Sequence, residues 1–272
     1  MRVTRFSSAP VRSLALVHPV EIDLTERGVS EDRRFRLIDD ADRLVDRLIV
    51  GCLATVKATT DAEATRLRLE FADGSVVDEE VELGAPIVAH VYERNTRSHV
   101  VLGPWSSALT RFVGRNVRLV RTDEIGGTRM AHPATMVTAG SLARLAQQLN
   151  VPSIDGRRFR MLIELDGQLA HEEDEWIGRA VTIGEAVLGV SGPVPRCAIT
   201  TQDPDSGVRD LDTLRALVDY RGAANFGVFG EVMRPGRVRV GDELTVSATV
   251  PPGAIGSGAG TTLDAEDGRG AQ

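Results

Sequence analysis

The chain has 272 residues, a formal net charge of −7 and two cysteines, and these three facts exclude several classes of protein. An acidic chain does not suit the phosphate backbone of a nucleic acid, so we expect no nucleic-acid partner. No apolar stretch approaches the roughly 20 residues that cross a bilayer, and no continuous apolar segment near the N-terminus suggests a signal peptide. We therefore expect a cytoplasmic protein without a membrane partner.

The basic residues and the cysteines narrow the choice of cofactor. Lys57 is the only lysine among 32 basic residues, and no serine or threonine follows it, which excludes a phosphate-binding P-loop. A pyridoxal phosphate enzyme would have to use this same lysine for its Schiff base. Two cysteines cannot supply the four thiolates of an iron–sulfur cluster or a structural zinc site. A redox cofactor held by this chain would therefore use very few thiolates.

The first hundred residues show the pattern of short β-strands separated by turns. Apolar and polar residues alternate over residues 66–71, and Asp73-Gly74 is a hairpin signal before the next strand. Residues 32–38 and 47–56 are predicted to form further strands.

Helical spacing of apolar residues occurs in three later segments. It predicts helices over residues 105–114, 141–149 and 211–220, with Ser141 as the N-cap of the second. Further strands are predicted over residues 117–120, 159–165, 180–190 and 238–246. Many short strands with few helices favour a mostly-β, α+β fold, in which helices pack on a barrel-like β architecture. Residues 251–272 contain almost nothing to bury and are predicted to be disordered.

The strongest chemical signal surrounds Cys197. Two prolines precede Arg196-Cys197, and Thr200 and Thr201 follow before a turn over residues 203–207. A rigid loop of this kind presents a thiol, and the adjacent arginine favours its thiolate form. Its natural partner is a soft metal or an electrophile. A small buried hydrophobic residue at a strand start remains an equal alternative on these residues alone.

Residues 195–207 resemble the signature of the MOSC superfamily, in the branch that contains the mitochondrial amidoxime-reducing component and its bacterial relatives. The shared features are an Arg-Cys pair, a Thr-Thr pair and an Asp-Pro-x-x-Gly turn. The resemblance extends from Ala9 to Leu244 with the same order and spacing of motifs. It includes residues 9–13, 32–39, 138–142, 158–160, 172–176 and 183–184.

The resemblance implies two domains and a pyranopterin molybdenum cofactor. The domains are an N-terminal β-barrel-like domain over residues 1–101 and a MOSC β-barrel domain over residues 102–250. The family's metal-binding and catalytic cysteine falls on Cys197. The family's pterin and phosphate contacts fall on Arg12, Ser13, Arg33, Ser141 and Arg160. Arginine forks, and a hydroxyl near a helix N-terminus, are suitable partners for an anionic cofactor.

Three further residues are assigned to cofactor binding from their positions. Arg196 and Thr200 flank the cysteine, and Asn225 precedes a glycine-containing segment that permits close approach. The family's Arg-Pro-Asn is altered here, because Met161 and Leu162 follow Arg160. An asparagine that would contact the pterin is therefore absent.

Other candidates have simpler interpretations. Cys52 lies in an apolar run and is predicted to be a core residue. The five histidines do not show metal-ligand spacing. Asp203 and Asp205 are predicted to build the turn after the cysteine, with a catalytic role as the lesser alternative.

The resemblance implies a molybdenum-dependent oxidoreductase that reduces N-oxygenated, that is N-hydroxylated, small molecules. Such an enzyme needs a separate ferredoxin-like or reductase electron donor as a partner. The alternatives are a non-catalytic carrier of the cofactor and a sulfur carrier with a persulfide on Cys197. A metal-free thiol-nucleophile enzyme is the remaining alternative, although no histidine lies in an obvious base position.

Overall fold

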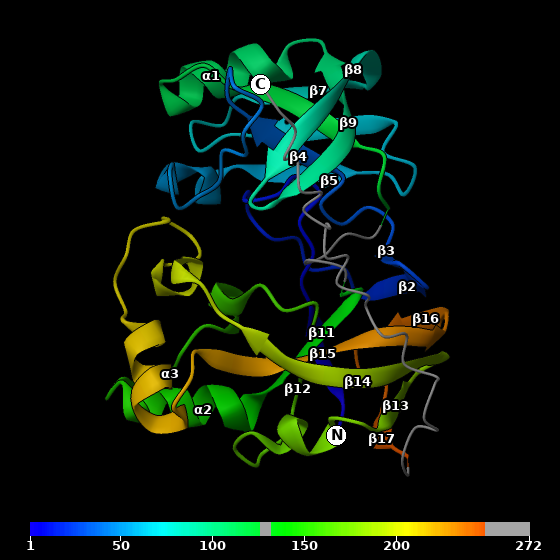
Figure 1. The fold of residues 1–272 in the computed structure, drawn as a ribbon, viewed down its shortest axis with the longest axis vertical. Coiled ribbons are helices and arrows are strands. Elements are labelled where there is room, and N and C mark those ends of the chain that lie inside the picture. The colour runs from blue at the N-terminus through cyan, green and yellow to red at the C-terminus, as the bar shows by residue number, and fades with distance from the viewer. Residues whose placement is uncertain (126–131, 248–272) are drawn as a thin grey trace, which may run out of the picture.

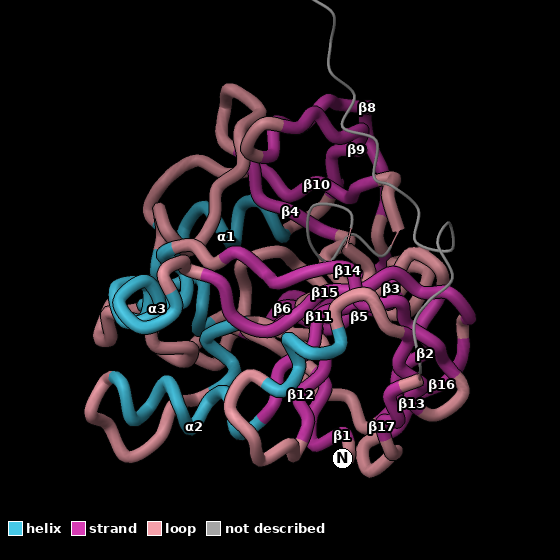
Figure 2. The backbone as a smooth tube through the Cα atoms, turned by 60° about the horizontal axis from the view of Figure 1, so that its bottom comes forward, coloured by secondary structure: helices cyan, strands magenta, loops and turns pink. Residues whose placement is uncertain are grey.

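The computed structural model describes residues 1–125 and 132–247, and this chain folds into two lobes stacked along the long axis of the molecule (Figure 1). Strands outnumber helices in both lobes, which confirms the mostly-β prediction (Figure 2). The predicted disordered tail, residues 251–272, lies outside the described residues. Within the described ranges, none of the helices is long and apolar enough to cross a membrane.

The upper lobe contains two antiparallel sheets around one apolar core. The four-stranded sheet has the order β4-β10-β9-β8, and the three-stranded sheet has the order β5-β6-β7. The strands are β4 (Phe35–Ile38), β5 (Lys57–Thr60), β6 (Arg66–Glu70), β7 (Val76–Glu80), β8 (Glu82–Val91), β9 (Arg94–Leu102) and β10 (Arg118–Thr122). Helix α1 (Trp105–Val113) closes this core with Trp105, whose indole N–H donates to the Leu67 carbonyl at 3.1 Å.

The lower lobe is built on a seven-stranded sheet with the order β1-β12-β11-β15-β14-β13-β17. Its strands are β1 (Val3–Phe6), β11 (Ala134–Thr138), β12 (Ile163–Leu165), β13 (Ala180–Ile183), β14 (Ala186–Pro195), β15 (Asn225–Arg234) and β17 (Leu244–Val246). The two ends of the sheet meet, because Leu244 N–H donates to the Met1 carbonyl at 2.8 Å and Arg2 bridges Glu243. The sheet therefore curls into a barrel, with helices α2 (Ala139–Gln148) and α3 (Thr213–Arg221) packed together beside it (Figure 1).

The sheets cross the predicted domain boundary after residue 101 in both directions. Strand β1 belongs to the lower barrel, and β2 (Glu21–Thr25) pairs with both β3 (Gly28–Val29) and β16 (Gly236–Arg239). In the other direction, β10 lies beyond residue 101 and pairs with β4 and β9 of the upper lobe. The boundaries at residues 101 and 250 stay a prediction about separate domains.

The strand predicted over residues 47–56 is wrong. The Asp46 carboxylate accepts the Leu48 N–H at 3.0 Å, and this turn leads into the 3-10 helix η1 (Gly51–Thr55). Because an aspartate that binds the backbone two residues ahead favours a turn, local hydrogen bonding prevails over strand pattern. The prediction that Cys52 is a core residue is wrong for the same reason, since its side chain is exposed on η1.

Two element boundaries also differ from the sequence prediction. The segment predicted as a strand over residues 159–165 starts as the 3-10 helix η2 (Gly156–Phe159), and only Ile163–Leu165 is a strand. Helix α2 begins at Ala139 with Thr138 as its N-cap, whose hydroxyl accepts the Ser141 N–H. Ser141 is thus inside the first turn, and its hydroxyl is available for other contacts.

Candidate functional site

Cys197 lies at the upper edge of the lower barrel, directly after β14. It is the N-cap of the 3-10 helix η4 (Ala198–Thr201), with extended backbone angles and an exposed side chain. Thr200 fixes the cysteine backbone, because its amide and hydroxyl both donate to the Cys197 carbonyl, at 3.2 and 3.1 Å. The Thr200 hydroxyl also shares a 2.8 Å hydrogen bond with Thr213 of α3. The alternative of a buried core cysteine is therefore wrong, and the thiol is presented to solvent on a fixed backbone.

The turn after the cysteine is held by its own aspartate, as predicted. One Asp203 oxygen accepts the amide and hydroxyl of Ser206, each at 2.8 Å. Outside the turn, Arg157 holds both oxygens of Asp205 at 2.7 and 2.8 Å. Bidentate pairs of this kind restrict geometry as well as adding attraction.

Two more arginines hold the loop to the lower lobe. Arg158 donates to both oxygens of Asp210, at 2.6 and 2.5 Å. The buried Arg196 donates to the carbonyls of Phe226 and Phe159, at 2.9 and 3.0 Å, and so joins β15 to η2 beneath the cysteine. Its guanidinium thus has a structural role, and its predicted contact with the cofactor stays a prediction.

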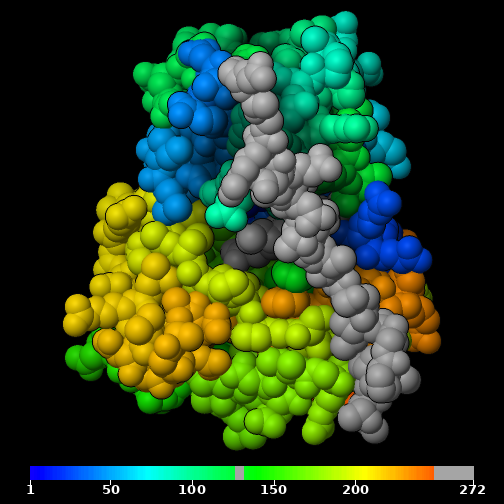
Figure 3. Space-filling model, in the orientation of Figure 1, coloured from blue at the N-terminus to red at the C-terminus, as the bar shows by residue number. Residues whose placement is uncertain are grey.

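The cysteine loop is docked on the upper lobe through Arg47. Arg47 Nε donates to Gln202 Oε1 at 2.8 Å, Nη2 donates to the Asp203 carbonyl at 3.0 Å, and Gln202 Nε2 returns a 2.8 Å bond to the Arg47 carbonyl. Both side chains are buried. Beside them two glycines touch, since a Cβ on Gly207 would lie 1.9 Å from the Gly51 carbonyl oxygen. Figures 1 and 3 show this contact, where the yellow loop meets the blue segment of the upper lobe. We call this region the junction.

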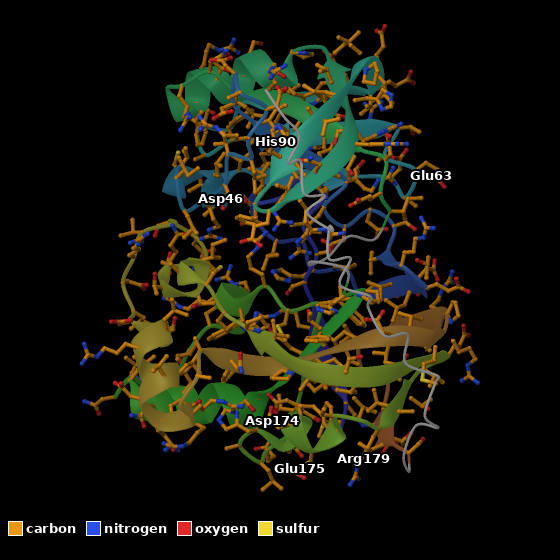
Figure 4. All side chains as sticks on the ribbon, in the orientation of Figure 1. Asp46, Glu63, His90, Asp174, Glu175 and Arg179 are labelled. Carbon is orange, nitrogen blue, oxygen red and sulfur yellow. The ribbon has the colours of Figure 1, made fainter. Side chains whose placement is uncertain are left out.

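A second set of contacts extends the junction towards Arg12. The hydroxyl of Tyr92 donates to Asp46 Oδ2 at 2.9 Å, and the Arg12 guanidinium lies 5.3 Å from the centre of the Tyr92 ring. Asp46 adjoins Arg47, and Figure 4 shows it in the part of the upper lobe nearest the lower lobe. Arg12 is therefore linked to the cysteine loop through Tyr92, Asp46 and Arg47, although 185 positions separate it from Cys197 in sequence (197 − 12).

Ser13 and Arg33 have strained backbone conformations in the N-terminal part of the chain. Both have positive φ, 74° and 54°, in a region that non-glycine residues seldom adopt. Arg33 is buried and paired with Asp32, whose other oxygen accepts the Ala9 N–H at 2.7 Å. Such strain persists only where surrounding contacts enforce it, which marks residues 9–13 as a held segment beside Arg12.

Ser141 lies in a different environment from the one predicted. Its hydroxyl donates to Glu173 Oε2 at 2.7 Å and accepts the His171 N–H at 2.9 Å. Glu173 is fully buried in the 3-10 helix η3 (Glu172–Trp176), and burial raises the pKa of its carboxyl. Figure 4 shows Asp174, the next residue, well away from Asp46. The chain's own carboxyl thus occupies the helix N-terminus where an anionic ligand was expected, and cofactor binding by Ser141 stays a prediction.

The remaining predicted residues are near the cysteine loop. Arg160 is buried with φ of 51° and lines a cavity of about 270 Å³ between the lobes, together with Arg47 and Asp205. The cavity is also lined by Ala15, Leu16, Val17, His18, Lys57, Thr59, Arg68, Glu70, Arg157 and Pro204. Asn225 begins β15 opposite Pro195, two residues before the cysteine. Among the described residues, no three His, Cys, Asp or Glu side chains form a metal-binding group, so a metal here would rely on Cys197.

The sequence alone does not single out four residues of the junction, which are Arg47, Gln202, Asp46 and Tyr92. Arg47 was assigned to a strand, and nothing distinguishes one arginine from another in an arginine-rich chain. The useful signal was Asp46, two residues before a backbone amide that it caps, which is typical of a turn.

The fold and the site together define a mostly-β protein that presents one exposed thiol on a fixed loop, beside arginines, at the contact of two lobes. Residues 114–245 match the family model of the MOSC domain. The chain therefore contains a MOSC domain over residues 114–245.

Three individual proteins illustrate the range of similarity. Mitochondrial amidoxime reducing component 2 of Bos taurus is 33% identical over 124 residues, which cover 41% of this chain and 36% of that protein. Molybdenum cofactor sulfurase of Caenorhabditis elegans is 25% identical over 237 residues, which cover 84% of this chain and 33% of that protein. The chain thus spans about a third of the length of these relatives. The solved YUAD protein of Bacillus subtilis superposes with a TM-score of 0.44 at 13% identity, covering 90% of this chain and 94% of that one.

Proposed function

We propose that the chain binds a pyranopterin molybdenum cofactor through the Cys197 thiolate and reduces N-oxygenated small molecules. The observation that carries this proposal is the exposed thiol on a loop that Arg47, Arg157 and Arg158 hold in place. A metal ligand has to be accessible and fixed, and a thiolate is the ligand that suits a soft metal. Similarity to amidoxime reducing components supports the choice of cofactor and reaction.

The residues near the junction suit an anionic cofactor, with one exception. Cys197 would hold the metal, while Arg12, Ser13, Arg33 and Arg160 would hold the pterin and its phosphate. Ser141 does not fit this set, because its hydroxyl is already engaged by Glu173 and the His171 amide. When bound, the cofactor supplies a metal that exchanges electrons and accepts an oxygen atom.

The reaction needs electrons from outside the chain. Reduction of an N-hydroxylated compound breaks the N–O bond, consumes two electrons and two protons, and releases an amine or amidine and water. We propose a separate ferredoxin-like or reductase partner as the electron donor. The exposed position of the cysteine loop leaves room for such a partner to approach.

A sulfur carrier is the second candidate, and one specific observation favours it. The molybdenum cofactor sulfurase matches 84% of this chain, twice the share that the amidoxime reducing component matches. In this alternative Cys197 carries a persulfide, and the chain passes its outer sulfur to a metal site. A non-catalytic carrier of the cofactor is the third possibility.

The decisive experiment measures molybdenum per chain after expression in a host that makes the cofactor. Cys197→Ala is compared with Cys52→Ala, because both cysteines are exposed and unpaired with each other. We expect near-stoichiometric molybdenum in the wild type and in Cys52→Ala, and none in Cys197→Ala. Turnover of a hydroxylamine with a chemical reductant then separates an enzyme from a carrier. Absence of the metal from the wild type, with a persulfide on Cys197 in intact mass spectra, would replace this proposal by the sulfur carrier.

A further inference from the structure

Arg36 is a charged residue in the middle of a sheet. It lies on β4 opposite Val120 of β10, and its side chain is only 4% exposed. Its neighbours Phe35 and Leu37 point into the core of the upper lobe, so Arg36 projects from the other face, together with Ile38. That face carries a small apolar cluster of Ile38, Leu44, Ala89, Val91 and Val120.

Among the described residues, few groups satisfy the Arg36 guanidinium. Its Nε and Nη1 atoms are buried and have no hydrogen-bond partner within residues 1–125 and 132–247. Its ion-pair contact is from Nη2 to Glu124 Oε2 at 3.8 Å, and Glu124 is half exposed. Burial, and then the charge of nearby Arg12, lower the pKa of Arg36 to about 10, so the group is still a cation at neutral pH. Arg94 adds a further positive charge.

A buried cation without hydrogen bonds is costly. Desolvation of a charged group takes several kcal/mol, roughly, unless a partner of opposite charge replaces the water. Arg12 and Arg94 add positive charge near Arg36, whose ion-pair partner Glu124 is half exposed. Arginine forms its strongest contacts with planar oxyanions, and a carboxylate matches its fork of N–H donors.

The position of this cluster relates it to the cysteine loop. Arg12 stacks on Tyr92, Tyr92 binds Asp46, and the adjacent Arg47 holds Gln202 of the cysteine loop. These contacts place the cluster on the upper side of the junction, with the thiol on the lower side.

We propose that Arg36, which lies near the Arg12 that would hold the cofactor, binds the carboxylate of the substrate, so that the substrates are N-oxygenated compounds that carry an acidic group. The proposal rests on the proposed function, because it treats the bound anion as part of a substrate. The anion site itself can be tested by binding, without turnover. The phosphate of the cofactor is also an oxyanion, and it would suit an arginine as well as a substrate carboxylate does. Of these two arginines, Arg12 is among the residues that the resemblance assigns to the pterin and its phosphate, and Arg36 is not.

The test compares benzamidoxime with 4-carboxybenzamidoxime, which differ by one carboxylate. Calorimetric binding to the full-length holoprotein gives the ratio of the two dissociation constants without any reaction. We expect the wild type to prefer the carboxylate compound by about 10-fold or more, as charge-assisted hydrogen bonds imply. We expect Arg36→Met to reduce this preference to about 2-fold or less, and Arg36→Lys to keep part of it, because the charge remains without the fork.

Arg118→Met is the matched control. Arg118 lies on β10 of the same sheet, but its guanidinium is paired with Asp42 and with the Asp39 carbonyl. The control should keep the wild-type preference. A wild-type preference below about 2-fold, or an equal loss in Arg118→Met, would overturn the proposal.

Molybdenum content separates the two sources of the anion. If Arg36 binds the substrate, Arg36→Met retains the metal of the wild type while it loses the preference for the carboxylate. If molybdenum falls together with the preference, Arg36 serves the cofactor phosphate and the substrate assignment is wrong. Preferential binding with no turnover of either compound would support the anion site and contradict the proposed reaction instead.

Discussion

The arginines on the two sides of the junction differ in how their charges are balanced. At the cysteine loop, Arg47 from the upper lobe and Arg157 and Arg158 from the lower lobe each donate to a defined oxygen of the loop that follows Cys197. On the upper side, Arg36 is buried with two nitrogens unpartnered among the described residues, and Arg12 lies nearby. A paired arginine fixes the backbone around it, whereas an unpaired one is costly until a ligand arrives. Arginines therefore have two roles here. Those at the cysteine loop fix its backbone, and Arg36 is available to bind an anionic ligand.

The largest effect on the junction is expected from a side chain added between Gly51 and Gly207. Gly207→Ala would place a Cβ 1.9 Å from the Gly51 carbonyl oxygen, at a backbone φ of 73°. We expect a loss of about 3 kcal/mol or more in the free energy of unfolding, because a clash with backbone cannot relax like one with a flexible side chain. Urea denaturation measures it. Gly222→Ala is the control, with a φ of 75° and nothing within 4 Å, and should lose only about 1 kcal/mol.

A smaller loss of stability is expected when Arg47, one of the paired arginines, is replaced. Arg47→Met removes the donors to Gln202 and Asp203 and leaves the buried Gln202 oxygen without its partner. We expect about 2 kcal/mol less stability, since an unsatisfied buried acceptor retains its desolvation cost. Arg43→Met, which removes an exposed pair with Asp39, should change stability by no more than about 0.5 kcal/mol. Equal losses in the two variants would mean that Arg47 does not hold the lobes together.

Arg36→Met should act in the opposite direction from Arg47→Met. Removing a buried cation that has two nitrogens without hydrogen bonds relieves desolvation, and methionine still fills the space of the apolar part of the arginine side chain. We expect the thermal midpoint of the protein without substrate to rise by about 2–4 °C, which corresponds to roughly 1 kcal/mol for a chain of this size. A fall in the midpoint would show that Arg36 stabilises the fold and would remove the contrast between the two groups.

Acid should weaken the lower lobe through His171. Burial, and then the charge of Arg221, lower the pKa of His171 to about 4, and Nε2 contacts the Tyr220 hydroxyl at 3.0 Å. Because the unfolded chain binds this proton at about pH 6.5, stability is full above that value and is lost as the pH falls towards 4. Allowing for solvent screening of a half-buried group, the loss is on the order of 1–2 kcal/mol. His171→Gln should flatten this part of the pH profile, measured by urea midpoints between pH 7 and 4.

The pH effect of Glu173 has the opposite sign. Burial raises the pKa of this carboxyl, so the folded state holds the proton more tightly, and stability decreases as the pH rises above the unfolded value near 4.5. Glu173→Gln keeps an oxygen for Thr138 and Ser141 without the charge. We expect its stability relative to the wild type to increase as the pH rises above about 4.5, and to level off once the pH has passed the pKa of the folded state. A difference that does not change with pH would argue that the carboxyl is already compensated in the native state.

The sequence identified the fold class and the cysteine loop because both depend on local patterns. Alternation of apolar residues predicted β6, helical spacing predicted α1 and α3, and two prolines with an Asp-Pro turn marked Cys197. These features are encoded within a few residues, where backbone preference and side-chain periodicity act directly. The MOSC motifs added the expected set of cofactor residues.

Only the tertiary structure decided which polar residues meet. Arg47 and Gln202 are 155 positions apart, and Ser141 and Glu173 are 32 apart, so neither contact leaves a local pattern. Whether an arginine is paired depends on burial and on partners brought in by other strands, which sequence spacing does not encode. For that reason the sequence placed Ser141 with the cofactor and overlooked Arg36. The packed structure places a carboxyl against Ser141 and leaves two buried nitrogens of Arg36 without hydrogen-bond partners among the described residues.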